Sequence, residues 1–393
     1  MRTTLLLSLH QIGGSLRTLQ IGDEWLPERE GGVARYYFEL LRHLPADRAS
    51  AVGLVVGSNE VAVSTQGRVQ SFARPDAYLP TRLLRLRSAA LPMMRGGEVD
   101  LLCCHFALYG IPLLDRLRAF PTVVHFHGPW AAESSLEGGS GYSPRAKANI
   151  ERLVYSRARR LIVLSEAFRG ELIHRYRIQE ERIRTVQGGV DTERFNVDVT
   201  RQEARAYIGW PQDRPILLAM RRQVRRMGLE NLVKAVGFLV PRHPDLLLLL
   251  GGSGPLAGAL QVLIHELGLQ RNVSLLGRVP DAQLPLAYRA ANISIVPTQA
   301  LEGFGLVTIE SLASGTPVFV TPVGGLTEIL RSFAPQCIFS STSAKTMAGE
   351  LGEALRGERH MPTEAECRAY SVERFSWNTI ASQVVDVYEE IFK

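Results

Sequence analysis

Short apolar runs of strand length alternate with longer amphipathic stretches along almost the whole chain of 393 residues. Runs such as 216–220 (ILLAM) and 246–250 (LLLLL) are apolar without interruption, so they lack the alternation of a strand with one face in water. We therefore expect strands that are buried on both faces. They are predicted at 18–22, 52–56, 99–104, 122–126, 160–164 and 183–186, and then at 216–220, 246–250, 273–276, 292–297 and 318–321.

Helical spacing of apolar residues fills the intervals between these runs. It is clearest at 33–44, and a second helix is expected from Ser165, a suitable N-cap, to about Tyr176. Strands separated by helices form parallel sheets that are covered on both faces, so the fold class is α/β with two doubly wound, Rossmann-like domains. The helices of the second half are predicted at 228–240, 256–267, 282–290, 305–314 and 325–332.

We predict an N-terminal domain at 1–198 and a second domain at 199–375, joined by the polar stretch 196–204. The carboxyl ends of the strands in the two domains are expected to face each other across a cleft, where open α/β sheets bind ligands. The segment 376–393 is predicted to be a helix with one apolar face, which could pack back on either domain, the N-terminal one included.

Composition narrows the class of protein. With 46% hydrophobic and 21% charged residues, and no apolar run near the ~20 residues of a membrane span, the chain is neither disordered nor an integral membrane protein. The first residues, MRTTLLLSLH, lack the core and cleavage site of a signal peptide and are interpreted as an extension. The four cysteines form no C-x-x-C pair, which disfavours metal or disulfide roles and fits the cytoplasm.

The net charge of +6 lies entirely in the first half of the chain. This asymmetry indicates an anionic partner for that half, namely a membrane surface, an acidic acceptor or nucleic acid; the alternative is a solubilising, arginine-rich surface. In the run 79–94 the residues Arg82, Arg85 and Arg87 are mixed with leucines. That run is either an ordinary surface helix or a helix that lies on an anionic bilayer.

The strongest group of candidate residues is 302–310, EGFGLVTIE, directly after a predicted strand. Gly303 and Gly305 allow a ligand to approach the backbone, and the helix that follows directs unpaired amides at an anion such as a phosphate. Glu302 and Glu310 could then bind hydroxyls on either side of a diphosphate. The alternative is a glycine-rich turn with a solvated and a capping glutamate.

Four arginines fall within 221–228, RRQVRRMG, at the carboxyl end of the strand 216–220. Guanidinium groups pair with phosphate oxygens, so this segment is a candidate phosphate clamp, or else a solvated basic turn. The glycine turn 251–255 follows the next strand and makes Gly252 a weaker candidate for a donor contact.

In the first half, Gly31 and Gly32 open a helix and, with Arg35, offer amides and a guanidinium to an anion. The run 125–130, HFHGPW, ends a strand, and alternation places His125 and His127 on one face. We interpret His125 as a packed histidine of the core or wall, and His127 as a functional residue exposed to the cleft.

Several common chemistries have no counterpart in this chain. There is no D-x-D pair for a metal, no P-loop, no G-x-G-x-x-G after the first strand and no His/Cys spacing of a zinc site. We therefore expect no metal ion and no cofactor.

Taken together, these segments resemble the retaining, GT-B fold glycosyltransferases of family 4, also called glycosyl transferases group 1. The resemblance covers nearly the whole chain from about residue 17, and the E-x7-E segment is specific when it follows GRVP…LAYRAA…VP. It rests on GGVARYYFEL, HFHGPW, RRQVRRMG, LLGRVPDAQLPLAYRAANISIVPT, EGFGLVTIESLASGTPV and TPVGGLTEIL.

The resemblance implies that the second domain holds a nucleotide-diphosphate sugar. Glu310 would bind the ribose hydroxyls, Glu302 would face the transferred sugar, and His127 would lie near the anomeric centre. The other implied contacts are backbone amides of Gly303, Phe304, Gly305, Leu306 and Val307 near the sugar and phosphates, Arg278 and Val279 beside the base, and Gly31 and Gly32 near the phosphate and acceptor.

One position departs from the family pattern. The family's R-x4-K pair maps to Arg222 and to position 227, which is Met227 instead of lysine. Arg226, alone or together with Arg225, is the expected substitute, and Arg222 and Arg226 would then stabilise the leaving diphosphate without a metal.

The implied activity is a metal-independent, retaining transfer of a hexose to an acceptor hydroxyl in glycolipid, polysaccharide or other glycoconjugate synthesis. The donor would be a UDP-sugar, with a GDP-sugar as the alternative, and no residue stands out as the nucleophile of a double displacement. The acceptor would be a carbohydrate, lipid-linked or small, with a cytoplasmic or peripheral inner-membrane location and no nucleic acid. The alternatives are a catalytically silent partner subunit that binds nucleotide sugars and a GT-B fold sugar-nucleotide epimerase.

Overall fold

The computed structural model describes residues 14–26, 28–29, 31–137 and 143–393. The N-terminal stretch MRTTLLLSLH, interpreted above as an extension, lies outside these residues.

The chain divides into two compact units. The first consists of Met1–Ala132, Ser140–Gly189 and Trp377–Lys393, and the second of Glu133–Gly139 and Val190–Ser376. The boundary at 189/190 lies before the predicted one at 198/199, because the short helix Thr192–Phe195 already packs on helices of the second unit and the Val190 amide donates to the Phe375 carbonyl at 2.7 Å. The last helix belongs to the first unit, one of the two positions that its apolar face allowed.

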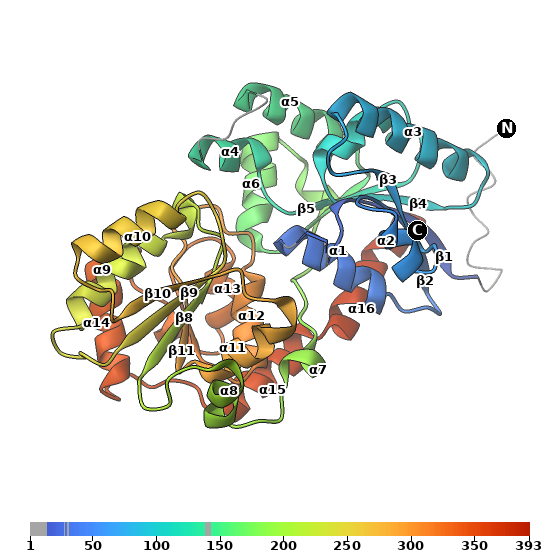
Figure 1. Ribbon diagram of the computed structural model, residues 1–393. Helices are drawn as coiled ribbons and strands as arrows, with labels where there is room; N and C mark the ends of the chain where they lie inside the picture. The colour runs from blue at the N-terminus through green and yellow to red at the C-terminus, as the bar shows by residue number, and fades with distance from the viewer. Residues whose placement is uncertain (1–13, 27, 30, 138–142) are drawn as a thin grey trace. The chain divides into compact units, whose positions relative to one another are not determined.

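The first unit is built on a parallel sheet of seven strands in the order β3-β2-β1-β4-β5-β6-β7 (Figure 1). Its central strands are almost wholly buried, in agreement with the apolar runs. The strand β3 was missed, because the edge sequence VQSFA is interrupted by polar residues. The strands are β1 (Leu16–Glu24), β2 (Ala49–Val56), β3 (Val69–Ala73), β4 (Leu101–Cys104), β5 (Thr122–Phe126), β6 (Arg160–Val163) and β7 (Ile183–Thr185).

Helices cover this sheet, and the chain returns to it at its C-terminus. The last helix, α16 (Trp377–Glu389), packs beside α1 (Gly32–His43) and buries Trp377, Val384 and Tyr388 (Figure 1). The other helices are α2 (Glu60–Ser64), α3 (Leu79–Arg95), α5 (Pro144–Tyr155), α6 (Glu166–Tyr176), and α4 (Trp130–Glu137), whose second half belongs to the second unit.

The helix α3 occupies the run that was considered for membrane contact. Arg82 donates to the carbonyls of Ala77 and Pro75, and Arg87 pairs with Asp115 at 2.7 Å. Arg82 and Arg87 therefore serve the fold of the first unit, whereas Arg85 makes no such contact with any residue that the structure describes.

The second unit contains a parallel sheet of five strands in the order β10-β9-β8-β11-β12. All five predicted strands are present within two residues of their predicted ends. The strands are β8 (Ile216–Met220), β9 (Leu247–Gly251), β10 (Val273–Gly277), β11 (Ile293–Val296) and β12 (Val318–Val320). Both predicted doubly wound sheets are thus confirmed.

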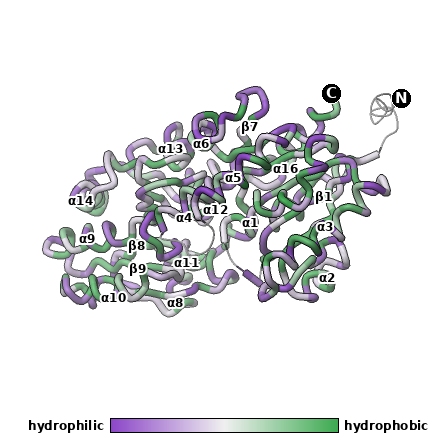
Figure 2. The backbone as a smooth tube through the Cα atoms, turned by 90° about the horizontal axis from the view of Figure 1, so that it is seen from above, coloured by the Kyte–Doolittle hydropathy of each residue, from purple (hydrophilic) through white to green (hydrophobic). Residues whose placement is uncertain are grey.

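Surface helices of both units, such as α3 and α14, alternate between hydrophobic and hydrophilic residues (Figure 2). This pattern buries one face of each helix against its sheet and leaves the other in water. The helices of the second unit are α7 (Thr192–Phe195), α8 (Arg201–Ile208), α9 (Leu229–Leu239), α10 (Ala257–Glu266), α11 (Leu284–Ala290), α12 (Leu306–Ala313), α13 (Leu326–Leu330), α14 (Ala344–Leu355) and α15 (Glu364–Phe375).

Candidate active site

Two consecutive arginines follow the carboxyl end of β8, the central strand of the second unit. Arg222 is exposed, and its Nη2 donates to Glu137 Oε1 at 3.3 Å. Arg221 is buried, and its Nη2 donates to Thr298 Oγ1 at 2.9 Å and to Glu302 Oε2. The residue that contacts Glu302 is therefore Arg221, which sequence reasoning passed over in favour of Arg222.

Arg226, the expected substitute for a lysine at 227, is buried and engaged on several sides. Its Nε donates to Glu137 Oε1 at 2.7 Å, its Nη1 donates to the Leu301 carbonyl at 2.8 Å, and its Nη2 lies 3.3 Å from Glu133 Oε2. Leu301 has a φ of 53°, a left-handed conformation that is costly for leucine. Arg226 thus holds the backbone of the loop before Glu302, while its contact with a phosphate stays a prediction.

The loop after β11 leads into α12 through Gly305. This glycine has a φ of 88°, and a Cβ built on it would lie 2.4 Å from a methyl group of Leu326, so conformation and space both require glycine. The first amides of α12, which include those of Leu306 and Val307, have no partner within the helix and carry its positive dipole end. Phe304 buries its ring against Phe375, so only its backbone, like that of the half-buried Gly303, can serve a ligand.

The two glutamates of the E-x7-E segment have different surroundings. Glu302 precedes the helix, and its Oε2 accepts from Thr298 Oγ1 at 3.0 Å in addition to Arg221. Glu310 lies inside α12 and is 4% exposed, and its Oε2 accepts from the Tyr288 hydroxyl at 3.0 Å. The Tyr288 hydroxyl thus helps to orient the Glu310 carboxylate, a group whose oxygens can accept from the hydroxyls of a diol.

The remaining predicted donor residues follow β9 and β10, which lie on one side of β8 in the sheet. Gly252 follows β9, and a Cβ there would lie 2.1 Å from the Arg221 carbonyl oxygen. The φ of Gly252 is 118°, and the loops after β8 and β9 approach each other closely at this point. Both facts explain why the residue is glycine without any role in ligand binding. Arg278, which is exposed, and Val279, which is half-buried, follow β10. A direct role of these three residues in donor binding stays a prediction.

In the first unit, the predicted glycines lie at the start of α1. Gly31 and Gly32 are exposed, and a Cβ on either would meet nothing within 4 Å. The backbone of this turn is therefore open to approach by another molecule. The amide of Arg35 donates to the Gly31 carbonyl at 2.9 Å, which closes the first turn of the helix.

Three histidines stack at the carboxyl ends of β4 and β5 in the first unit. The rings of His105 and His125 are 4.1 Å apart and inclined by 12°, and those of His105 and His127 are 5.6 Å apart and inclined by 17°. His125 is buried, and its Nε2 lies 2.8 Å from the Tyr388 hydroxyl of α16, so its predicted role in the core is confirmed. His105 was missed, although it directly follows the predicted strand 99–104 and so lies near the carboxyl end of a strand, as His125 does.

A chain of hydrogen bonds leads from Thr18 through Gln20 and His105 to His127, and its donors and acceptors determine the tautomer of His127. The Thr18 hydroxyl donates to the Ser50 carbonyl at 2.9 Å, so it accepts from Gln20 Nε2 at 3.0 Å. The Gln20 Oε1 atom then faces His105 Nε2 at 2.9 Å and requires a proton on that nitrogen. Neutral His105 must accept at Nδ1, where His127 Nε2 lies at 3.3 Å. The chain therefore selects the tautomer of His127 that is protonated on Nε2, with an acceptor at Nδ1.

Burial keeps these imidazoles neutral. It lowers the pKa of His127 to about 4, and burial together with the adjacent imidazoles lowers the pKa of His105 and of His125 well below the usual value. His127 is half-buried, so it remains available to a ligand as a neutral hydrogen-bonding group.

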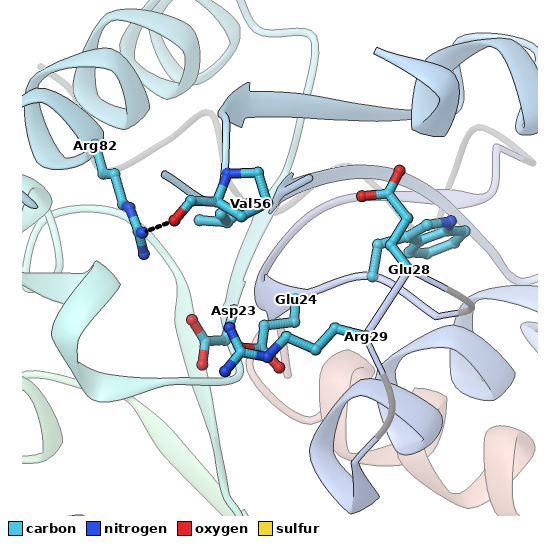
Figure 3. A pocket seen from close by; sticks show the side chains of 8 residues that line it. Asp23, Glu24, Glu28, Arg29, Val56 and Arg82 are labelled. Carbon is cyan, nitrogen blue, oxygen red and sulfur yellow. Dashed lines mark hydrogen bonds and ion pairs between the residues drawn. The ribbon is translucent and has the colours of Figure 1, made fainter. Parts of the chain in front are cut away.

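A small pocket of about 130 Å³ opens beyond the end of β1 in the first unit (Figure 3). Asp23, Glu24, Arg29 and Arg82 line it, and Arg29 pairs with Glu24 at 3.0 Å. Burial, aided by the charge of Glu24, raises the pKa of Asp23 to about 6. The carboxylates can accept hydrogen bonds from hydroxyl groups, and the guanidinium groups can donate to them. Sequence reasoning did not anticipate this pocket.

Among the described residues, no group of three His, Cys, Asp or Glu side chains is placed to hold a metal ion. No helix in the described part of the chain is both long and apolar enough to cross a membrane. The four cysteines are buried and unpaired.

The two units match two family descriptions. Residues 30–194 match "Glycosyltransferase Family 4", and residues 200–374 match "Glycosyl transferases group 1".

Curated relatives are similar over most of their length. The D-inositol 3-phosphate glycosyltransferase of Nocardia farcinica is 31% identical over 364 residues, which cover 88% of this chain and 78% of that protein. The enzyme of the same name from Corynebacterium jeikeium is 31% identical over 327 residues, with coverage of 80% and 78%.

Solved structures share the fold. Sucrose-phosphate synthase from Thermosynechococcus elongatus superposes with a TM-score of 0.77 at 22% identity, over 96% of this chain and 99% of that one. Anabaena HepE in complex with UDP and glucose superposes with a TM-score of 0.77 at 17% identity, over 95% and 100%. With both halves matched in order and the parallel sheets in place, the chain belongs to the family 4 glycosyltransferases of GT-B fold.

Proposed function

We propose that this glycosyltransferase transfers a hexose from a UDP-sugar to an acceptor hydroxyl, with retention of the anomeric configuration and without a metal ion. The observation that carries the proposal is the group of residues at the carboxyl end of β8 and the start of α12. It combines the exposed Arg222, the first backbone amides of α12, which include those of Leu306 and Val307, and the carboxylate of Glu310 that Tyr288 contacts.

This group suits a nucleotide diphosphate. The helix N-terminus and Arg222 favour the negative charge that the leaving diphosphate gains as the sugar–phosphate bond breaks. Glu310 would accept from the two ribose hydroxyls. The donor base is a proposal supported by the likeness to Anabaena HepE, which was solved with UDP and glucose.

The reaction exchanges one bond for another at the anomeric carbon. The bond from that carbon to the phosphate oxygen breaks, the bond to the acceptor oxygen forms, and the acceptor proton passes to the leaving diphosphate. If the acceptor enters on the face that the diphosphate leaves, the configuration is retained. Neutral His127, with its acceptor nitrogen Nδ1, would orient the sugar through a hydroxyl.

The acceptor is proposed to be a polyol or sugar, free or lipid-linked, that binds the first unit. The name of the curated relatives, D-inositol 3-phosphate glycosyltransferase, makes inositol phosphate the first compound to test. The pocket beside Asp23 and Arg82 offers the donors and acceptors that a polyol requires. We place the enzyme in the cytoplasm, in keeping with its four unpaired thiols.

The test is a donor screen by thermal shift with UDP-, GDP- and ADP-sugars, followed by transfer assays with inositol, inositol 3-phosphate and simple glycosides. We expect transfer from a UDP-sugar, an unchanged rate in EDTA, and an anomeric coupling in the NMR spectrum of the product that matches the donor. Glu310→Ala and Arg222→Ala should abolish donor binding or transfer, and full activity in both would refute the proposal.

Two other outcomes would identify the alternative functions. Tight UDP binding without transfer or donor hydrolysis would indicate a silent partner subunit, an alternative suggested by Met227. Isomerisation of the donor in the absence of an acceptor would indicate an epimerase.

A further inference from the structure

The guanidinium of Arg221 is a buried cation in the middle of the proposed donor site. Arg221 is 9% exposed, and its Nη2 contacts Glu302 Oε2 and Thr298 Oγ1. Its Nε atom is buried and has no hydrogen-bond partner among the described residues. Other arginine Nε atoms of the chain share this property, but Arg221 differs from them by its position beside Glu302 in the proposed donor site, where its N–H group could donate to a bound ligand.

Arg221 also occupies the space in front of position 227. Its Nη2 lies 2.6 Å from Met227 Sδ. A lysine at 227 is one bond longer than methionine beyond this point, so its ammonium group would reach the place that the guanidinium now fills. The cation that position 227 lacks is thus present, but it comes from residue 221.

Arg226 is a poorer substitute for that lysine. Its guanidinium is bound to Glu133, Glu137 and the Leu301 carbonyl, and it supports the strained loop that precedes Glu302. To contact a phosphate, Arg226 would have to give up these partners.

We propose that Arg221, rather than Arg226, is the second cation of the subsite that binds the donor diphosphate, and that Arg226 positions the loop at Leu301. This inference rests on the proposed function. Arg221 Nε donates to a diphosphate oxygen while Nη2 remains on Glu302, and Arg222 binds the diphosphate from the solvent side. When the sugar–phosphate bond breaks, Arg221 and the α12 amides stabilise the charge on the leaving oxygen.

The test compares Arg221→Met with the exchange variant Arg221→Met/Met227→Lys. The exchange variant moves the thioether from position 227 to position 221 and places a cation at position 227. Calorimetry measures the Kd of UDP, UMP and uridine, with GDP and ADP in parallel, and transfer assays give kcat. Arg271→Ala, an exposed arginine outside the site, is the control. Thermal unfolding verifies that each variant is folded.

We expect R221M to weaken UDP binding at least tenfold, to leave uridine binding unchanged and to lower kcat. The exchange variant should regain UDP affinity to within about threefold of the wild type, since a charge-assisted hydrogen bond to phosphate is restored. If R221M does not fold because Glu302 loses its partner, the exchange variant still tests the inference, because it restores a cation beside Glu302.

Three results would overturn the inference: UDP binding and kcat of R221M equal to the wild type, an equal loss of UDP and uridine binding, or no recovery in a folded exchange variant. Arg226→Met distinguishes Arg221 from Arg226, because a selective loss of UDP binding in Arg226→Met would show that Arg226 binds the phosphate, whereas we expect that loss in Arg221→Met. If the wild-type protein itself binds neither UDP, GDP nor ADP, the proposed function fails and the inference falls with it.

Discussion

The neutral state of His127 predicts a specific dependence of stability on pH. The pKa of His127 is lowered by burial to about 4 in the folded protein, whereas an unfolded histidine has a pKa of about 6.5. Between these values the unfolded state binds the extra proton, so the contribution of His127 to stability falls as the pH falls. From pH 7.5 to pH 5.0 the loss is about 2 kcal/mol, most of the ~3.4 kcal/mol that the full shift represents.

The variant His127→Gln isolates this contribution, because glutamine can still donate to His105 but does not titrate. Burial raises the pKa of Glu151 to about 7, so Glu151 stabilises the fold as the pH falls and opposes the histidine in the pH curve of the wild type. The difference between wild type and variant cancels such shared groups. We expect the stability of the wild type relative to H127Q to fall by about 2 kcal/mol between pH 7.5 and pH 5.0.

Urea unfolding followed by tryptophan fluorescence is the suitable assay. Three of the four tryptophans, Trp25, Trp130 and Trp377, belong to the first unit, so the signal reports mainly on the unit that contains His127. The exchange of an exposed histidine, His174→Gln on α6, is the matched control. A difference between wild type and H127Q that is the same at both pH values would refute the argument that burial holds this imidazole neutral.

Three further predictions concern individual residues within each unit. Glu310→Gln should weaken UDP-sugar binding by 10- to 100-fold in calorimetry, because charge-assisted hydrogen bonds to the ribose become neutral ones, and Tyr288→Phe should weaken it less, by up to about tenfold. Tyr388→Phe should lower the free energy of unfolding by about 1–3 kcal/mol in urea, because His125 and Gln20 both lose a buried partner, while the exposed Tyr207→Phe should have no effect. Arg85→Ala should reduce sedimentation with anionic vesicles by no more than about fivefold, and a complete loss of binding would show that α3 is a membrane-contacting helix after all.

The fold was largely predictable because hydrophobic periodicity depends on local sequence. Parallel strands that are buried on both faces read as apolar runs, so nearly every strand was found. The exception, β3, lies at the sheet edge, where VQSFA is only partly buried and the pattern is weak. Ser165 caps α6 as expected, with its hydroxyl accepting from the Phe168 amide at 3.2 Å.

The partners within the site were not predictable in the same way. Alternation implies that Arg221 and Arg222 point in opposite directions, but only the path of the loop before Glu302 decides which of them meets that carboxylate. In the sequence, the strands β9, β10 and β11 lie between the two arginines and this loop. The Tyr388 contact with His125 is likewise invisible to local patterns, since α16 joins the first unit from the far end of the chain.

The role of the excess positive charge could not be predicted from the sequence alone either. By structural units, the first holds 26 Lys and Arg against 19 Asp and Glu, and the second holds 19 against 20, so the asymmetry survives the division of the chain. Several of these arginines nevertheless form ion pairs within the first unit. Arg48 pairs with Asp386 and Glu389, and Arg184 pairs with Glu390. We therefore predict that the excess charge would attract an anionic acceptor through the field of the whole unit rather than through one basic patch. We expect kcat/KM for an anionic acceptor to fall as the ionic strength rises. The exchange of a single surface arginine should change that dependence little.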